Sequence, residues 1–196
     1  RDRDWGWDNL LVTSIRTEKN KMYEGESLEE IAKKRGQDPV NTFFDLIVEE
    51  DNAATMISFS MSEEDVRTVM RSPFGMVCTD GIVLGRPHPR AYGSFPRVLG
   101  PYVRDGVLRL EEAVRRMTSS PAQRFGLRDR GLLRSGMWAD ITVFDPETIV
   151  DRATYENPRQ FPKGIEYVVV NGELTVDSGE YTGIRAGKVL RHLVDS

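Results

Sequence analysis

The sequence contains very little cysteine and histidine. Cys78 is the one cysteine among 196 residues, so no disulfide can form within the chain, and we expect a reducing, cytoplasmic environment. The two histidines, His88 and His192, are too few for a histidine-rich metal site. No apolar run approaches the roughly 20 residues that cross a bilayer, so we expect no association with a membrane.

Positive charge is not in excess either. Lys and Arg number 27 against 31 Asp and Glu, and the resulting formal net charge of −4 argues against a general nucleic-acid-binding surface. Hydrophobic residues at 39% and charged residues at 30% are typical of a globular chain with a core of its own. The chain starts at Arg1 instead of Met, which we interpret as a cut from a longer polypeptide, a cloned piece, or a sequence whose beginning is not included.

Helix boundaries are well marked near the N-terminus. Ser27 and Glu30 have the spacing of a capping box, which predicts a helix that begins at Leu28. Gly36 predicts the end of that helix. The pair Asp38-Pro39 combines an N-cap with a proline in the first turn, and it predicts a second helix directly afterwards.

Three runs in the first half predict strands: residues 9–15, 54–60 and 75–78. A helix capped by Ser62 separates the last two, so we expect a parallel, right-handed βαβ unit with both strands buried. Cys78, at the end of the third run, is predicted to be an inert core thiol, since an apolar strand raises the pKa of a thiol.

The pattern changes near residue 127. Before it, residues 95–103 and 110–125 predict helices. After it come short β-branched or alternating runs at 139–144, 165–171 and 173–176, with Asn171-Gly172 in the position of a hairpin turn. The chain therefore passes from α/β to all-β structure.

The most informative segment is GMVCTDGIVLGRPHPRAY, residues 75–92. Asp80 follows an apolar run at the place where a parallel α/β barrel carries its chemistry. Arg90 can grip a carboxylate through two hydrogen bonds, and His88 supplies an imidazole. The alternatives are structural: Asp80 caps a turn or pairs with an arginine, Arg90 pairs with an acid, and His88 hydrogen-bonds the backbone of its loop.

The string that runs from Asp80 through HPRAYGSFPRVLGPYVRDGVLRLEEAVRRMTSSPAQRFGLRDRG to GMWADITVFD and FPKGIEYVVVNGE resembles one family. It is similar to the C-terminal part of the N-acyl-D-amino-acid deacylases (D-aminoacylases) of the amidohydrolase superfamily. The resemblance extends from about Trp7 to Arg191. GMWADITVFD is shared by many amidohydrolases, whereas the Asp-then-HPRxYGSFPRVL string is much narrower and points to the deacylase branch.

The resemblance implies an α/β fold, namely the C-terminal portion of a (β/α)8 barrel followed by strands of a small β-sandwich. Residues 1–128 then correspond to the last barrel strands and helices, and residues 129–196 to the C-terminal part of the sandwich. Because two strands taken from an eight-stranded barrel leave an open edge, we expect self-association or pairing with a missing N-terminal portion of the barrel.

The resemblance also implies roles for individual residues. Asp80 matches the catalytic aspartate, which takes a proton from metal-bound water and later protonates the leaving amine. Arg90 would hold the α-carboxylate of an N-acyl-D-amino acid, and His88 would line the substrate pocket or brace the loop.

Zinc is the metal that the resemblance implies, yet the family's metal ligands are absent from this chain. Those ligands come mainly from upstream, and neither His88 nor His192 belongs to a His-x-His pair. Asp80 is the one candidate ligand that remains, and zinc takes three or four protein ligands. We therefore expect the chain by itself to bind no zinc stably and to be inactive.

Two alternatives stay open at this point. One is another amidohydrolase that opens cyclic amides, similar to a dihydroorotase or hydantoinase. The other is a non-catalytic structural or interaction module that keeps the tail of the fold.

Overall fold

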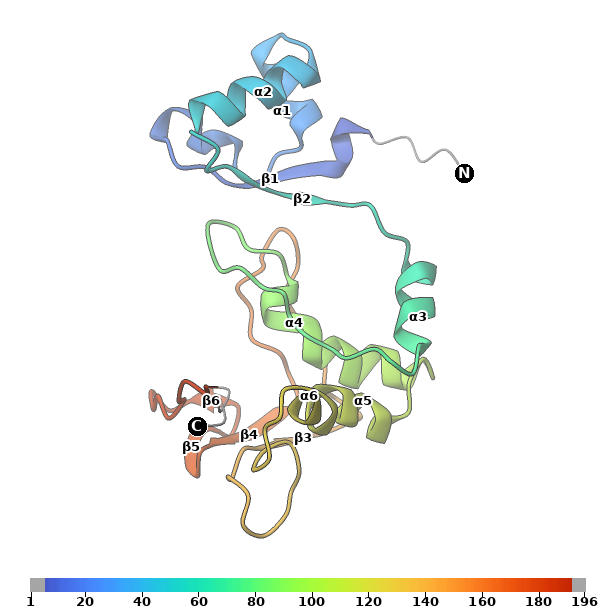
Figure 1. The fold of residues 1–196 in the computed structure, drawn as a ribbon. Coiled ribbons are helices and arrows are strands. Elements are labelled where there is room, and N and C mark those ends of the chain that lie inside the picture. The colour runs from blue at the N-terminus through green and yellow to red at the C-terminus, as the bar shows by residue number, and fades with distance from the viewer. Residues whose placement is uncertain (1–5, 192–196) are drawn as a thin grey trace. The chain divides into compact units, whose positions relative to one another are not determined.

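The computed structural model describes residues 6–191, which divide into two compact units (Figure 1). The first unit contains the described residues up to Val66 together with Asp80–Ala91 and Thr154–Arg159. The second contains Arg67–Thr79, Tyr92–Ala153 and the described residues from Gln160 on. The first unit therefore draws on three separate segments of the chain. His192 lies outside the described residues.

The first unit is built on a two-stranded antiparallel ribbon of β1 (Leu10–Ser14) and β2 (Thr55–Ser58). Helices α1 (Leu28–Arg35) and α2 (Pro39–Glu49) lie on one side of this ribbon, as Figure 1 shows. Short 3-10 turns, η1 (Trp7–Asn9) and η2 (Glu18–Tyr23), flank β1. The helices and the ribbon bury a common apolar core: Val12, Ile15, Leu28, Ile31 and Leu46.

The helix boundaries of this unit are those that the sequence predicted. The Ser27 side chain accepts a hydrogen bond from the Glu30 backbone, and the Glu30 carboxylate accepts one from the Ser27 backbone, so the capping box is confirmed. Gly36 ends α1 in the left-handed conformation, at φ 64°. Asp38 caps α2, and Pro39 opens it. These ends are set locally, because each cap satisfies backbone groups that the helix leaves unpaired.

A buried carboxylate joins the end of α2 to the segment after β1. Glu50 is fully buried and accepts hydrogen bonds from the backbone N–H groups of Arg16 and Thr17, from the Thr17 hydroxyl and from the Asn20 amide. Burial raises the pKa of this carboxyl, but the hydrogen bonds from Thr17, Asn20 and Arg16 outweigh burial and lower the pKa to about 2. Glu50 is therefore ionised and holds residues 16–20 against α2.

The predicted parallel βαβ unit is wrong. Helix α3 (Glu63–Arg71) forms with Ser62 at its start, as predicted. However, residues 75–78 form no strand, and β2 pairs with β1 in the antiparallel sense. A parallel pair needs its faces covered on both sides, and β1 offers β2 an antiparallel partner within the same unit.

The predicted burial of these two runs is wrong as well. Three of the four residues of β2 are exposed, and Cys78 is exposed instead of lying in a core. Phe74, just before the third run, is 91% exposed. Met76, Ile82, Val83 and Leu84 are also exposed, as expected for an apolar run that has no strand neighbour among the described residues.

Helices make up much of the second unit before its sheet. α4 (Arg90–Arg97) starts in the first unit and continues into the π-helical turn η3 (Val98–Tyr102), and α5 (Leu110–Met117) and α6 (Ser119–Arg124) follow. The single helix predicted over 110–125 is wrong, because it breaks at Thr118. Pro121 explains the break, since its ring would clash with the carbonyl of Met117 in a continuous helix.

A four-stranded antiparallel sheet completes the second unit. β3 (Ile141–Phe144), β4 (Ile165–Val170), β5 (Glu173–Asp177) and the short β6 (Glu180–Tyr181) pair in chain order. The predicted hairpin is confirmed: Asn171 and Gly172 both have positive φ, at 51° and 87°. Two consecutive positive φ values match the twist of the flanking strands.

Within residues 6–191, we find no helix both long and apolar enough to span a bilayer. The division at residues 128 and 129 into a barrel share and a sandwich share stays a prediction.

Candidate functional site

The segment Asp80–Ala91 carries all three predicted site residues, Asp80, His88 and Arg90. Asp80 adopts a left-handed backbone conformation, at φ 44°, which aspartate tolerates better than most residues. The next residue, Gly81, lies flush against the first turn of α4: an added Cβ would stand 2.7 Å from the Cα of Ala91. The close approach of Gly81 therefore fixes Asp80 beside the start of α4.

Asp80 and Arg90 form an ion pair, with 2.7 Å between Oδ2 of Asp80 and Nη2 of Arg90. Both side chains contact solvent, at 76% and 42% exposure. Exposed pairs of this kind contribute little free energy, so another carboxylate can replace Asp80 on the guanidinium at small cost. The pairing that the structural alternative predicted is present, and the catalytic role of Asp80 stays a prediction.

His88 contacts the backbone of the same loop. The Arg90 backbone N–H donates to Nδ1 of His88 at 3.0 Å. On its other side, Nε2 of His88 lies 3.5 Å from the Tyr155 hydroxyl, and the two rings meet edge to face with centroids 5.3 Å apart. His88 is therefore positioned to brace the loop, and its contact with substrate stays a prediction.

Sequence reasoning missed Tyr155 and its segment, Thr154–Arg159. Tyr155 also packs against Phe59, which follows β2, with ring centroids 4.7 Å apart. The segment lies between β3 and β4 in the chain, in the part predicted to be sandwich. Its polar and aromatic residues are typical of any surface loop, and no local sequence pattern indicates that it contacts residues 80–91.

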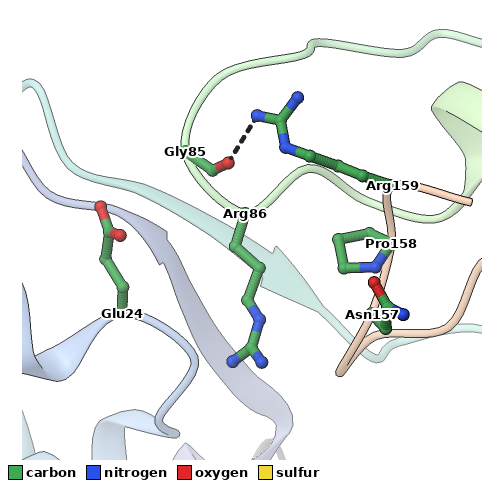
Figure 2. Close-up of a pocket in the computed structure, with 6 residues that line it drawn as sticks. All are labelled: Glu24, Gly85, Arg86, Asn157, Pro158 and Arg159. Carbon is green, nitrogen blue, oxygen red and sulfur yellow. Dashed lines mark hydrogen bonds between the residues drawn. The ribbon is translucent and has the colours of Figure 1, made fainter.

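A cavity of about 370 Å³ lies where the two segments meet in the first unit, and Figure 2 shows its lining. Arg159 donates to the Gly85 carbonyl at 2.9 Å, Arg86 points away from Arg159, and Glu24 lies at the left of the view. The remaining lining residues are Asn157 and Pro158.

Arg86 anchors the loop from both its backbone and its side chain. Its backbone N–H donates to the Thr13 carbonyl at 2.7 Å, and its guanidinium donates to the Glu156 carbonyl at 2.7 Å. The guanidinium also fills the space beside Gly25, where an added Cβ would lie 1.8 Å from Nη1. Asp80, His88 and Arg90 lie outside the cavity lining.

Metal ligands do not assemble in this part of the chain. Among residues 6–191, no group of three or more His, Cys, Asp or Glu side chains is placed to hold a metal ion. Asp80 has a guanidinium as its close partner, and Cys78 is exposed. The described residues therefore do not fit a zinc site, which needs three or four protein ligands.

Taken with the comparisons, these features define the class of the protein: the chain belongs to the Amidohydrolase family, whose sequence pattern matches residues 3–176. It is 44% identical over 168 residues to a D-aminoacylase of Alcaligenes xylosoxydans xylosoxydans, covering 85% of this chain and 34% of that protein. It is 45% identical over 169 residues to an N-acyl-D-glutamate deacylase of the same organism, covering 85% of this chain and 33% of that protein.

Solved structures agree with the sequence comparison. A D-aminoacylase crystal structure superposes with a TM-score of 0.82 at 41% identity, covering 92% of this chain and 37% of that one. The N-acyl-D-glutamate deacylase of Bordetella bronchiseptica, solved with zinc and a phosphonate inhibitor that mimics the tetrahedral intermediate, gives 0.80 at 39% identity. That match covers 89% of this chain and 36% of the other. The chain thus has the fold of part of these enzymes and spans about a third of the length of the relatives.

Proposed function

We propose that the chain supplies the C-terminal part of a metal-dependent hydrolase that cleaves N-acyl-D-amino acids to a D-amino acid and a carboxylate. Residues 1–128 would contribute the last strands and helices of a (β/α)8 barrel, and residues 129–196 the C-terminal part of a β-sandwich. The observation that carries the proposal is the contact of Asp80 with Arg90 at the start of α4. In this proposal Asp80 would be the acid–base group, and Arg90 would be the neighbouring group that binds the carboxylate.

The two side chains have complementary roles in this proposal. Arg90 binds the α-carboxylate of the substrate, and its exposed pairing with Asp80 is the contact that the substrate replaces. The displaced Asp80 carboxylate then accepts a proton from the attacking water and returns it to the leaving amine. The shared loop keeps the two groups within reach of one substrate.

Zinc in the parent enzyme would be held by residues that this chain does not supply, and we propose that the chain alone is inactive. Its partners would be the small substrate and either a second copy or the missing N-terminal portion of the barrel. The expected absence of nucleic-acid and membrane partners and the cytoplasmic location stay predictions from composition.

The similarity to deacylases favours this activity over that of a cyclic-amide hydrolase. Three deacylases of different substrate class are 43–45% identical to the chain over 140–169 residues. A dihydroorotase of Endomicrobium trichonymphae is 32% identical over 135 residues. The three deacylase names share the N-acyl-D-amino-acid skeleton and differ in the amino acid, so the skeleton is the part of the substrate that we propose.

A chimera tests the proposal. In it, this chain replaces the matched third of the D-aminoacylase from Alcaligenes xylosoxydans xylosoxydans, and hydrolysis of N-acetyl-D-methionine is measured with zinc present. We expect turnover by the chimera and none by the 196-residue chain. Asp80→Asn should lower kcat by roughly 10²–10⁴-fold, whereas the control Asp51→Asn, at an exposed acid paired with Arg16, should leave it unchanged.

Three results would contradict the proposal. Turnover by the chain alone would show that it carries a complete metal site. A folded chimera that opens dihydroorotate but leaves N-acetyl-D-methionine intact would favour the cyclic-amide alternative. A folded chimera active on neither substrate would favour a non-catalytic module.

A further inference from the structure

The segment Thr154–Arg159 contacts the loop that carries the candidate site at three separate points. Two of these contacts use arginine side chains and backbone carbonyls, and the third joins two aromatic rings. The pairs are Arg86 to the Glu156 carbonyl at 2.7 Å, Arg159 to the Gly85 carbonyl at 2.9 Å, and Tyr155 to His88 at 3.5 Å. The segment is therefore held to the loop through Tyr155 and Glu156 near its start and through Arg159 at its end.

The segment also has internal structure. The Thr154 backbone N–H donates to the Asn157 carbonyl, and the Asn157 backbone N–H donates to the Thr154 hydroxyl at 3.0 Å. These bonds close a tight turn around Tyr155, whose ring packs edge to face between Phe59 and His88. The turn thus presents Tyr155 to His88 in a defined orientation.

The hydrogen bonds of His88 select one form of its ring. Because the Arg90 backbone N–H donates to Nδ1, that nitrogen carries no proton. A neutral imidazole then holds its proton on Nε2, which faces the Tyr155 hydroxyl. In this tautomer Nε2–H donates a hydrogen bond to the Tyr155 hydroxyl oxygen, and this contact favours the tautomer that leaves Nδ1 free to accept from Arg90.

We propose that Tyr155 is a positioning residue for the candidate site: it holds His88 in the Nε2–H tautomer and thereby fixes the backbone of Arg90. Fixing that backbone orients the first turn of α4, from which the Arg90 guanidinium meets Asp80 at 2.7 Å. The catalytic meaning of this inference rests on the proposed function, but the geometry that it describes does not require turnover.

The small number of histidines makes the test direct. The chain has two, so ¹⁵N-histidine labelling of the whole 196-residue chain gives two sets of ring signals, and His192→Gln assigns them. The spectra are recorded above the ordinary imidazole pKa of about 6.5. His88 should show two well-separated ring nitrogens of a single tautomer. Tyr155→Phe keeps the ring and removes the hydroxyl, and it should move both His88 nitrogens toward the average of the two tautomers.

A matched control and a second variant keep the result clear. Tyr181→Phe removes a hydroxyl that donates to the Ile184 carbonyl in the other unit, and it should leave the His88 signals unchanged. Arg159→Met removes the bond to Gly85 without touching the Tyr155 ring, and it should move the signals in the same direction. If Tyr155→Phe fails to fold, Arg159→Met decides the question.

Unchanged His88 signals in folded Tyr155→Phe would overturn the inference, because the hydroxyl would then have no influence on the tautomer. The measurement is made on the chain alone, without substrate or metal. A failure of the deacylase proposal would appear in the chimera as missing hydrolysis, and it would leave this spectroscopic result intact.

Discussion

Local sequence patterns predicted the α-helix boundaries correctly in residues 6–66 of the first unit and the strand incorrectly in the segment 72–84. In residues 6–66, the ends of α1 and α2 form as their caps predict, and Glu50 joins α2 to the residues after β1. In 72–84, the apolar run that predicted a strand forms none, and the largest side chain of the segment, Phe74, is 91% exposed. The comparison teaches that a helix cap is satisfied locally, whereas a strand also needs a neighbour.

The largest expected loss of stability comes from removing the buried carboxylate of Glu50. Glu50→Ala leaves several buried donors unpaired, among them the backbone N–H groups of Arg16 and Thr17, and it should lower the free energy of unfolding by about 3 kcal/mol. Urea unfolding measures the loss. Glu29→Ala, which removes a surface pair with Lys33, should cost less than about 0.5 kcal/mol. Equal losses in the two variants would contradict the role given to Glu50.

The same carboxylate predicts a pH dependence of stability. Its pKa is lowered in the folded chain from 4.5 to about 2, so the folded state favours the ionised form. The contribution of Glu50 is complete above pH 4.5 and is lost as the pH falls toward 2. The free energy of unfolding, measured with urea across this pH range, should change less steeply with pH for Glu50→Gln than for the natural chain. An identical slope in both would show that other groups carry the dependence.

A smaller loss of stability is expected from a substitution at Gly81, where the loop of residues 80–91 contacts α4. Gly81→Ala would place a Cβ 2.8 Å from the Cβ of Ala91, so the loop must shift at a cost of about 2 kcal/mol. The backbone amide hydrogens of residues 80–91 should exchange faster with solvent. The control Gly187→Ala meets no described atom within 4 Å and should leave exchange unchanged. Unaltered exchange in Gly81→Ala would mean that Gly81 does not hold Asp80 in place.

The smallest effect on stability is expected in the exposed segment. Phe74→Ser removes an apolar ring that is 91% exposed, so the free energy of unfolding should change by less than about 0.5 kcal/mol. Self-association, measured by light scattering, should fall because exposed apolar surface drives it. A loss of stability of 2 kcal/mol or more would show that the segment is packed in solution.

Sequence reasoning identified the short-range features of the candidate site and missed the long-range ones. Asp80, His88 and Arg90 were selected from one loop, and the structure brings all three together. Tyr155 was not selected, because its contact with His88 joins residues that are 67 positions apart. No periodicity, cap or turn signal encodes such a contact.

The sequence by itself determined the ends of α1 and α2 and the hairpin at Asn171-Gly172, because each depends on backbone groups only a few residues away. Only the tertiary structure decided that β2 pairs with β1 and that residues 154–159 join the loop of Asp80. Strand pairing and loop contacts depend on which distant segments are available, since each apolar or polar group must find its partner in space.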